Sequence, residues 1–227
     1  MTSGAWAVVP VKELAQAKTR LAPALPPEAR VALVEAMLED VLAALAAARG
    51  LAGIALVTVD PFAERLGLRH GVRVLREGAR DGHTGAVTAA ARTLERESCA
   101  TIITLPGDVP AVTPAEIERV LAAHREGHSF TIVPAHDRRG SNAVVLSPPT
   151  AVSLAFGNDS FTPHLAAARR CGIEPVVVED VPGIARDVDA REDLAALLDL
   201  PGAHATKAVL RDLMLRGGAP HPHGAAA

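Results

Sequence analysis

The stretch AWAVV, residues 5–9, is a short apolar run that ends at Pro10. A second apolar run, GIALVTV, follows at residues 53–59, and both runs are typical of strands buried on two faces. Between them, apolar residues recur at spacings of four and three, as a helix requires, at Val34, Leu38, Val41 and Leu45. Pro26-Pro27 stands where such a helix would begin. This stretch therefore predicts a β-α-β unit.

The same alternation continues through most of the chain. Further strands are expected at residues 72–75, 101–105, 130–134, 143–146 and 175–178. Further helices are expected at residues 84–97 and 114–126, and from near Pro163 and Arg191. Such alternation predicts an α/β fold with three layers, α/β/α, around a mostly parallel sheet with right-handed crossovers.

No shift in composition marks a second domain, so we expect one domain over residues 1–200 and a C-terminal extension over 201–227. The extension carries one expected helix at about residues 207–216. It then ends in GGAPHPHGAAA, which has little to bury. We expect this end to be disordered.

Composition excludes several classes of function. The chain has 227 residues and a net charge of -3, which offers no broad attraction for a polyanion, and only 2% of its residues are aromatic. Nucleic-acid binding is therefore not expected. No apolar run approaches the ~18 residues of a membrane span, and we expect no signal peptide before the first strand. Cys99 and Cys171 fit neither a zinc site nor a disulfide framework. We expect a cytoplasmic protein with reduced thiols and no membrane partner.

The loop after the first strand is rich in cations. Pro10 is followed by Lys12, and then by Lys18 and Arg20 in the run AKTRL. Such a loop could hold a triphosphate, or it could be an ordinary solvated basic loop. The pattern GxxxxGK[ST] is missing from the chain, so a P-loop is ruled out.

Two acidic motifs follow strands or precede a helix. Asp108 lies in PGDVP, directly after the expected strand 101–105, where a carboxylate would suit a divalent cation or could simply form a turn. Asp187 and Asp189 lie in RDVD, just before the expected helix near Arg191. They could bind a metal, or Asp189 could cap that helix.

A third candidate region combines small polar residues with a helix start. Ser141 and Asn142 follow Gly140, and the run FGNDSFTPH at residues 156–164 contains Gly157 and Ser160. Pro163 near a helix start would leave first-turn N–H groups free to hold a small anion together with Ser160. An ordinary capped helix is the alternative.

Taken together, these motifs resemble the 2-phospholactate guanylyltransferase family (CofC/FbiD) of coenzyme F420 biosynthesis, within the MobA-like nucleotidyltransferases. The resemblance extends to about Leu198 and rests on five motifs in the family's order: PVK to AKTRLA, PGDVP, GSNAV, FGNDSF with the following His164, and RDVDAREDL. One departure is that the chain has His83-Thr84-Gly85 where relatives tend to carry Gly-Leu-Asn.

The resemblance implies a Rossmann-like nucleotidyltransferase that transfers GMP from GTP to a phosphorylated three-carbon acid and releases pyrophosphate. The acid would be 2-phospho-L-lactate, phosphoenolpyruvate or 3-phosphoglycerate, and some family members are homodimers. The rival functions are a nucleotidyltransferase for molybdopterin or a sugar phosphate, a glycosyltransferase that binds metal through Asp187 and Asp189, and a nucleotide-binding module without turnover.

The resemblance also assigns roles to the candidate residues. Mg²⁺ would bind Asp108 and Asp187, with Asp189 as the second choice at the latter position. The nucleotide would bind at Pro10, Lys12, Lys18 and Arg20, and Lys18, Arg20 and Asp108 would serve catalysis. The acceptor would bind at Ser141 or Asn142, Gly157 and Ser160, with help from His164.

Overall fold

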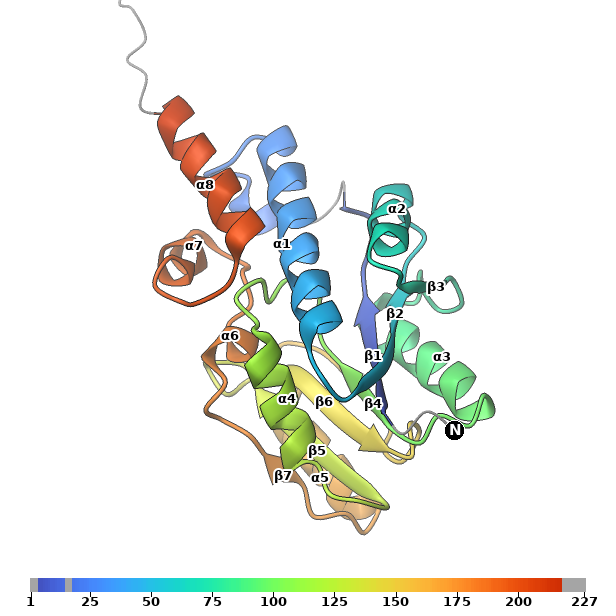
Figure 1. The fold of residues 1–227 in the computed structure, drawn as a ribbon. Coiled ribbons are helices and arrows are strands. Elements are labelled where there is room, and N and C mark those ends of the chain that lie inside the picture. The colour runs from blue at the N-terminus through green and yellow to red at the C-terminus, as the bar shows by residue number, and fades with distance from the viewer. Residues whose placement is uncertain (1–3, 15–17, 218–227) are drawn as a thin grey trace, which may run out of the picture.

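The computed structural model describes residues 4–14 and 18–217 of the chain (Figure 1). In these residues seven strands form one sheet in the order β3-β2-β1-β4-β6-β5-β7. The strands are β1 (Ala5–Pro10), β2 (Leu51–Val57), β3 (Arg73–Leu75), β4 (Ile102–Thr104), β5 (Ser129–Pro134), β6 (Ser141–Ser147) and β7 (Val176–Val177). Each predicted strand is present, with ends shifted by a few residues.

The sheet is mostly parallel, as the sequence predicts. β1 pairs in parallel with both β2 and β4, and β5 pairs in parallel with β7. β6 is the exception, because it runs antiparallel to β4 and to β5. The first residues of β6 therefore lie at the same edge of the sheet as the last residues of β1 and β4.

Helices cover both faces of the sheet and make the three predicted layers. They are α1 (Pro27–Ala47), α2 (Pro61–Arg69), α3 (Gly82–Arg96), α4 (Pro114–Ala123), α5 (Phe161–Arg170), α6 (Pro182–Ala185), α7 (Arg191–Leu197) and α8 (His204–Gly217). Val9 packs with α1 and α4 on one face, whereas its neighbour Val8 packs with α3 and α5 on the other. Within the described ranges, none of these helices combines the length and apolarity needed to cross a bilayer.

Two of the helices, α2 and α6, were not predicted from the sequence. α2 begins at Pro61 and is capped by the Asp60 carboxylate, which accepts hydrogen bonds from the N–H groups of Phe62 and Ala63. The same carboxylate also accepts from the N–H of Leu14, 46 residues earlier. Asp60 thus ties the loop after β1 to the start of α2.

The extension after residue 200 packs back onto the domain, because α8 lies against α1 (Figure 1). The buried Asp40 carboxylate of α1 accepts hydrogen bonds from the N–H groups of Ala205 and Thr206 and from the Thr206 hydroxyl. These are free N–H groups of the first turn of α8, so Asp40 acts as its cap from a distant part of the chain. The expectation of a disordered end concerns residues 218–227, which lie outside the described residues.

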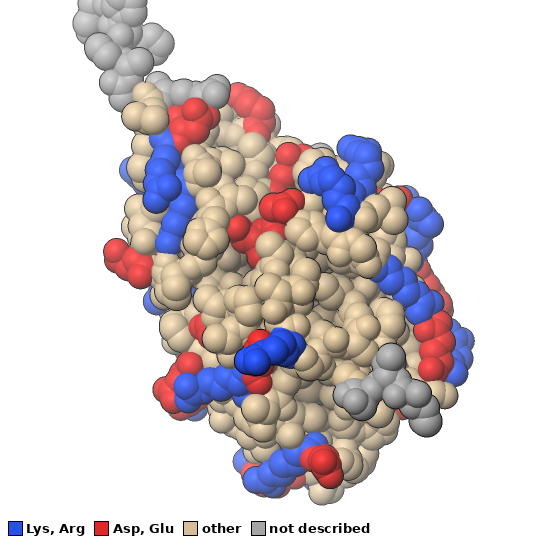
Figure 2. All heavy atoms as spheres, viewed as in Figure 1, with Lys and Arg blue, Asp and Glu red and all other residues tan. Residues whose placement is uncertain are grey.

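Charged side chains of both signs are interspersed on the face shown in Figure 2. Several charged side chains of the described residues form ion pairs at the surface, among them Arg76 with Glu64 and Arg119 with Asp180. Such exposed pairs typically contribute less than about 1 kcal/mol to stability. This face therefore fits the small net charge and offers no single-sign surface to a polyanion.

Candidate active site

The sheet opens a cleft of about 830 Å³ at the point where the strand order reverses. β2, the next strand along the chain, lies on one side of β1, whereas β4 lies on its other side. The loops that follow β1 and β4 therefore lead away in opposite directions and leave a crevice beyond the carboxyl ends of these two strands. This is where ligands bind in open α/β sheets. The volume is within the usual range for small-molecule sites. The cleft is lined mainly by the loops after β1, β3 and β4, and by apolar side chains of α1.

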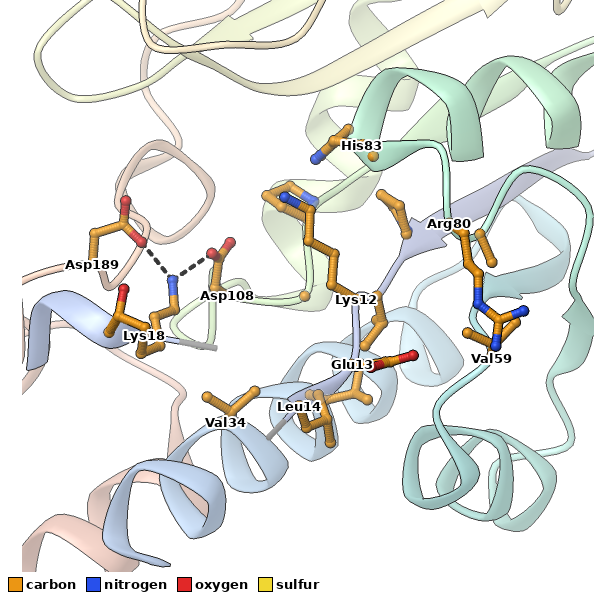
Figure 3. A pocket seen from close by; sticks show the side chains of 18 of the residues that line it. Lys12, Glu13, Leu14, Lys18, Val34, Val59, Arg80, His83, Asp108 and Asp189 are labelled. Carbon is orange, nitrogen blue, oxygen red and sulfur yellow. Dashed lines mark hydrogen bonds and ion pairs between the residues drawn. The ribbon is translucent and has the colours of Figure 1, made fainter. Parts of the chain in front are cut away.

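Lys18 lies between two carboxylates at one end of this cleft (Figure 3). Its Nζ is 2.6 Å from Asp108 Oδ2 and 2.6 Å from Asp189 Oδ1. Only 8% of the Lys18 side chain is exposed. Burial alone would lower the pKa of Lys18, but the charges of Asp108 and Asp189 outweigh it and raise the pKa above its ordinary value. The ammonium is therefore charged and balanced by two anions.

The Lys18 backbone is also unusual, since its φ of 54° lies in the left-handed region. A non-glycine residue in this region costs of order 1 kcal/mol or more, and such strain is concentrated at functional sites. Arg20 follows in a short 3₁₀ helix (Thr19–Leu21), and its guanidinium lies 3.7 Å from Asp189 Oδ2. Two cations of the predicted loop thus meet the same carboxylate.

Backbone contacts hold the two acidic motifs together. The N–H of Val188, between Asp187 and Asp189, donates to the carbonyl of Asp108 at 3.0 Å. Asp193 accepts from the N–H groups of Asp189 and Ala190, so it performs the capping task that the sequence left open for Asp189. The Asp189 carboxylate bonds instead to Lys18.

Asp187 faces a different partner. Its Oδ1 accepts a hydrogen bond of 3.2 Å from the side-chain amide of Asn142, which also donates to the carbonyl of Ile184. Burial, and then the negative charge of Asp108, raises the pKa of the Asp187 carboxyl above its ordinary value. The Asp187 carboxyl therefore binds a proton more readily than an ordinary aspartate does, and a cation bound beside it would lower its pKa again.

The segment carrying α6 is held close to β6 and α4. The N–H of Gly183 donates to the Glu116 carboxylate at 2.6 Å. A Cβ on Gly183 would come within 2.3 Å of the carbonyl oxygen of Ala111, so this position requires glycine. This close packing fixes the chain just before Asp187.

Two further cleft residues, Arg80 and His83, were not predicted as site residues. Arg80 lies at the end of the cleft opposite Lys18, and Lys12 and His83 lie between them (Figure 3). Burial lowers the pKa of His83 to about 4, with the Asp108 charge opposing and the Lys12 charge reinforcing this shift. The imidazole is therefore neutral near pH 7. Both residues follow the carboxyl end of β3, so the same strand-end rule could have found them.

The polar residues proposed for the acceptor form a buried network beside the cleft. Ser141 Oγ lies 3.0 Å from His164 Nδ1, and the Ser160 hydroxyl donates to Ser141 Oγ at 3.2 Å. His164 Nε2 accepts a hydrogen bond of 2.9 Å from the N–H of Ala155. Gly157, in contrast, is exposed, and a Cβ added there would meet no atom within 4 Å.

The start of α5 offers fewer donors than the sequence suggested. The N–H of Phe161 donates to the carbonyl of Arg139, and the N–H of His164 donates to the backbone carbonyl of Ser160. Pro163 has no N–H to give. Donors for an anion near this helix would therefore come largely from hydroxyl groups.

The candidate residues form two adjoining groups. Those that line the cleft are Pro10, Lys12, Lys18, Arg20, Asp108 and Asp189. Ser141, Asn142, Gly157 and Ser160 do not line it, but Asn142 reaches Asp187, and the His83 ring contacts the Phe156 ring in a tilted arrangement with centroids 4.2 Å apart. In the described part of the chain, no three His, Cys, Asp or Glu side chains are grouped closely enough to hold a metal ion.

A cleft at the switch point of a mostly parallel sheet, with cations facing carboxylates, is typical of enzymes that handle nucleotide phosphates. A solved nucleotide-diphospho-sugar transferase from Desulfovibrio desulfuricans G20 is similar in fold, with a TM-score of 0.75 and 20% identity over 96% of this chain and 98% of that one. A nucleotidyl transferase from Methanothermobacter gives a TM-score of 0.59 with 18% identity, over 93% of this chain and 100% of that one. The predicted nucleotidyltransferase fold is confirmed.

Residues 5–220 match the family model described as "Guanylyl transferase CofC like", and the chain belongs to this family. The phosphoenolpyruvate guanylyltransferase of Conexibacter woesei is 33% identical over 220 residues, which are 96% of this chain and 93% of the relative. The 2-phospho-L-lactate guanylyltransferase of Methanothermobacter thermautotrophicus is 34% identical over 88% of this chain and 86% of its own. The predicted family resemblance is confirmed, and the chain is an enzyme of the guanylyltransferase class.

Proposed function

We propose that this enzyme transfers GMP from GTP to the phosphate of a phosphorylated three-carbon acid and releases pyrophosphate, in coenzyme F420 biosynthesis. Phosphoenolpyruvate is the first candidate for the acid, because several relatives of 33–39% identity carry that name. 2-Phospho-L-lactate and 3-phosphoglycerate are the other candidates. The observation that carries the proposal is the cleft in which Lys18 is bracketed by Asp108 and Asp189.

The proposed reaction needs no side-chain base. The second pKa of a phosphate monoester is about 6, so at neutral pH the attacking oxygen of the acceptor is already largely anionic. The barrier comes from bringing two anions together and from the charge that develops on pyrophosphate as it leaves. Lys12, Lys18 and Arg20 supply positive charge in this cleft, with Arg20 suited to bidentate contact with phosphate oxygens.

The residues present also fit Mg²⁺, which takes carboxylate and phosphate oxygens. The oxygens of Asp108 and Asp189 already hold one cationic group between them, and the half-buried carboxyl of Asp187 is close enough to Asp108 for that charge to raise its pKa. We propose Asp108 with Asp187 or Asp189 as its protein ligands. When bound, Mg²⁺ supplies positive charge to the phosphate oxygens of GTP. The Lys18 ammonium occupies the same carboxylate oxygens. If Mg²⁺ took its place there, Lys18 would be free to bind a phosphate oxygen.

We place the acceptor beside Ser141, Asn142, Gly157 and Ser160. The serine hydroxyls and the Asn142 amide can donate to anionic oxygens of the acceptor without using the cations that we assign to GTP. The open space next to Gly157 leaves room for a small acid close to the backbone. Asn142 donates a hydrogen bond to Asp187, which supports a proposal in which the two substrates occupy adjoining positions.

The test is a pyrophosphate-release assay that crosses GTP, ATP and CTP with the three acids and with a sugar phosphate, beside a direct measurement of GTP binding. We expect release only with GTP and at least one acid, and loss of that release in Asp108→Asn, which removes a charge from a strand end and leaves the core intact. Binding of GTP without release in any combination would support a nucleotide-binding module instead. Release with a sugar phosphate but with none of the acids would move the enzyme to another acceptor class.

A further inference from the structure

His164 is buried and its two ring nitrogens have different partners. The N–H of Ala155 is a donor that cannot accept, so His164 Nε2 must present its lone pair to it at 2.9 Å. Burial, reinforced by the nearby His83, lowers the pKa of His164 to about 4, so the ring is neutral near pH 7. A neutral ring that accepts at Nε2 carries its hydrogen on Nδ1.

This tautomer determines what Ser141 can do. His164 Nδ1–H donates to Ser141 Oγ at 3.0 Å, and the Ser160 hydroxyl donates to the same oxygen at 3.2 Å. A serine hydroxyl has two acceptor lone pairs and one hydrogen, so both lone pairs of Ser141 are then occupied. Its own hydrogen must be donated to a third group. No acceptor for this hydrogen is found among the described residues.

The position of Ser141 indicates what that third group is. Ser141 is the first residue of β6, at the cleft edge of the sheet, and the next residue is Asn142, which bonds to Asp187. Ser141 is largely buried, with 8% of the residue exposed, and it lies beside the cleft and not in its lining. A hydroxyl that is committed to donation selects an acceptor-only group, such as a phosphate or carboxylate oxygen.

We propose that His164 is a positioning residue that makes the Ser141 hydroxyl an obligate donor to an anionic oxygen of the acceptor substrate. This inference rests on the proposed function and assigns one contact within it. His164 itself need not touch the substrate. Its contribution is to prevent Ser141 from turning its hydrogen inward, so that the donor is oriented before the substrate arrives.

The experiment measures KM for the acceptor and for GTP in His164→Phe, Ser141→Ala and the double variant. We expect each single variant to raise the acceptor KM about tenfold while the GTP KM stays within about twofold. The double variant should be no worse than Ser141→Ala alone, because both changes remove the same donated hydrogen bond. His164→Asn, whose amide can still donate near the Nδ1 position, should recover part of the loss.

A matched control is His124→Phe. His124 is a half-buried imidazole that is also bonded to hydroxyls, 2.8 Å from Ser147 Oγ and 2.9 Å from Thr131 Oγ1, but its partner Ser147 lies at the far end of β6. We expect His124→Phe to lower the melting temperature without changing the acceptor KM selectively. If His164→Phe fails to fold, Ser141→Ala and His164→Asn carry the test.

Several results would overturn the inference. They are an unchanged acceptor KM in Ser141→Ala, equal changes in both KM values in His164→Phe, and losses that multiply in the double variant. In each case a wild-type enzyme that still releases pyrophosphate would leave the proposed function standing. A wild-type enzyme that releases none with any acid would contradict the proposed function itself, and the inference with it.

Discussion

Replacing Lys18 by Met should tighten the binding of a divalent cation in the absence of nucleotide. The Lys18 ammonium bonds to Asp108 and Asp189 at 2.6 Å each, so a cation that uses these carboxylates must displace it. A hydrogen bond between charged groups contributes about 1.5–3 kcal/mol when well formed. Because the Asp108 and Asp189 side chains are 31% and 45% exposed, we discount each bond to about 1 kcal/mol. Removing both competing bonds is then equivalent to ~2 kcal/mol, or roughly 30-fold in Kd.

The assay is a titration of Mn²⁺ followed by electron paramagnetic resonance, which detects the free ion. Mn²⁺ binds the same kind of carboxylate oxygen as Mg²⁺ does. Lys12→Met is the matched control, because it removes an equal charge from the same cleft at a residue that has no ion pair with either carboxylate among the described contacts. An unchanged or weaker Kd in Lys18→Met would refute the competition. An equal gain in Lys12→Met would show that net charge alone, and not contact with the carboxylates, sets the affinity.

Three further results are expected. Gly157→Val should raise the acceptor KM far more than the GTP KM at an unchanged melting temperature, since an added Cβ meets no atom within 4 Å; equal changes in both KM values would contradict the acceptor placement. Asp40→Ala should lower the free energy of unfolding in urea by about 2 kcal/mol, because it leaves the first turn of α8 uncapped; a change below ~0.5 kcal/mol would show that the cap is dispensable. The low pKa of His164, about 4, means that the unfolded chain binds a proton near pH 6.5 that the folded chain does not. The free energy of unfolding is therefore highest above pH 6.5 and falls by on the order of 3 kcal/mol as the pH decreases toward 4. Replacing His164 by Phe should flatten this part of the plot of melting temperature against pH.

The sequence predicted the order of the strands along the chain because buried parallel strands are short apolar runs separated by periodic helices. The run at residues 5–9 and the strand before Asp108 are both found at the centre of the sheet. The prediction omitted α2, although Asp60 followed by Pro61 is a helix-start signal. It also omitted α6, which has only four residues and depends on packing at Gly183.

Candidate site residues were found in the sequence for the same local reason, since loops after strand ends carry chemistry in this class of fold. Lys12, Lys18, Arg20 and Asp108 were all selected in this way and line one cleft. Arg80 and His83 were not selected because the loop after β3, REGARDGH at residues 76–83, mixes charges of both signs and contains neither a cluster of cations alone nor a pair of alternate carboxylates.

The sequence by itself determined which residues form strands and which polar side chains stand next to their ends, because these properties depend on neighbours within a few positions. Only the tertiary structure decided the direction of β6, since an apolar run has the same pattern in either direction. Its antiparallel direction brings Ser141 and Asn142 to the cleft edge, whereas a parallel strand would carry them to the opposite edge. The structure likewise decided the partners of Lys18, which lie 90 and 171 residues away, because the balance of one buried cation by two carboxylates depends on distances that no local pattern encodes.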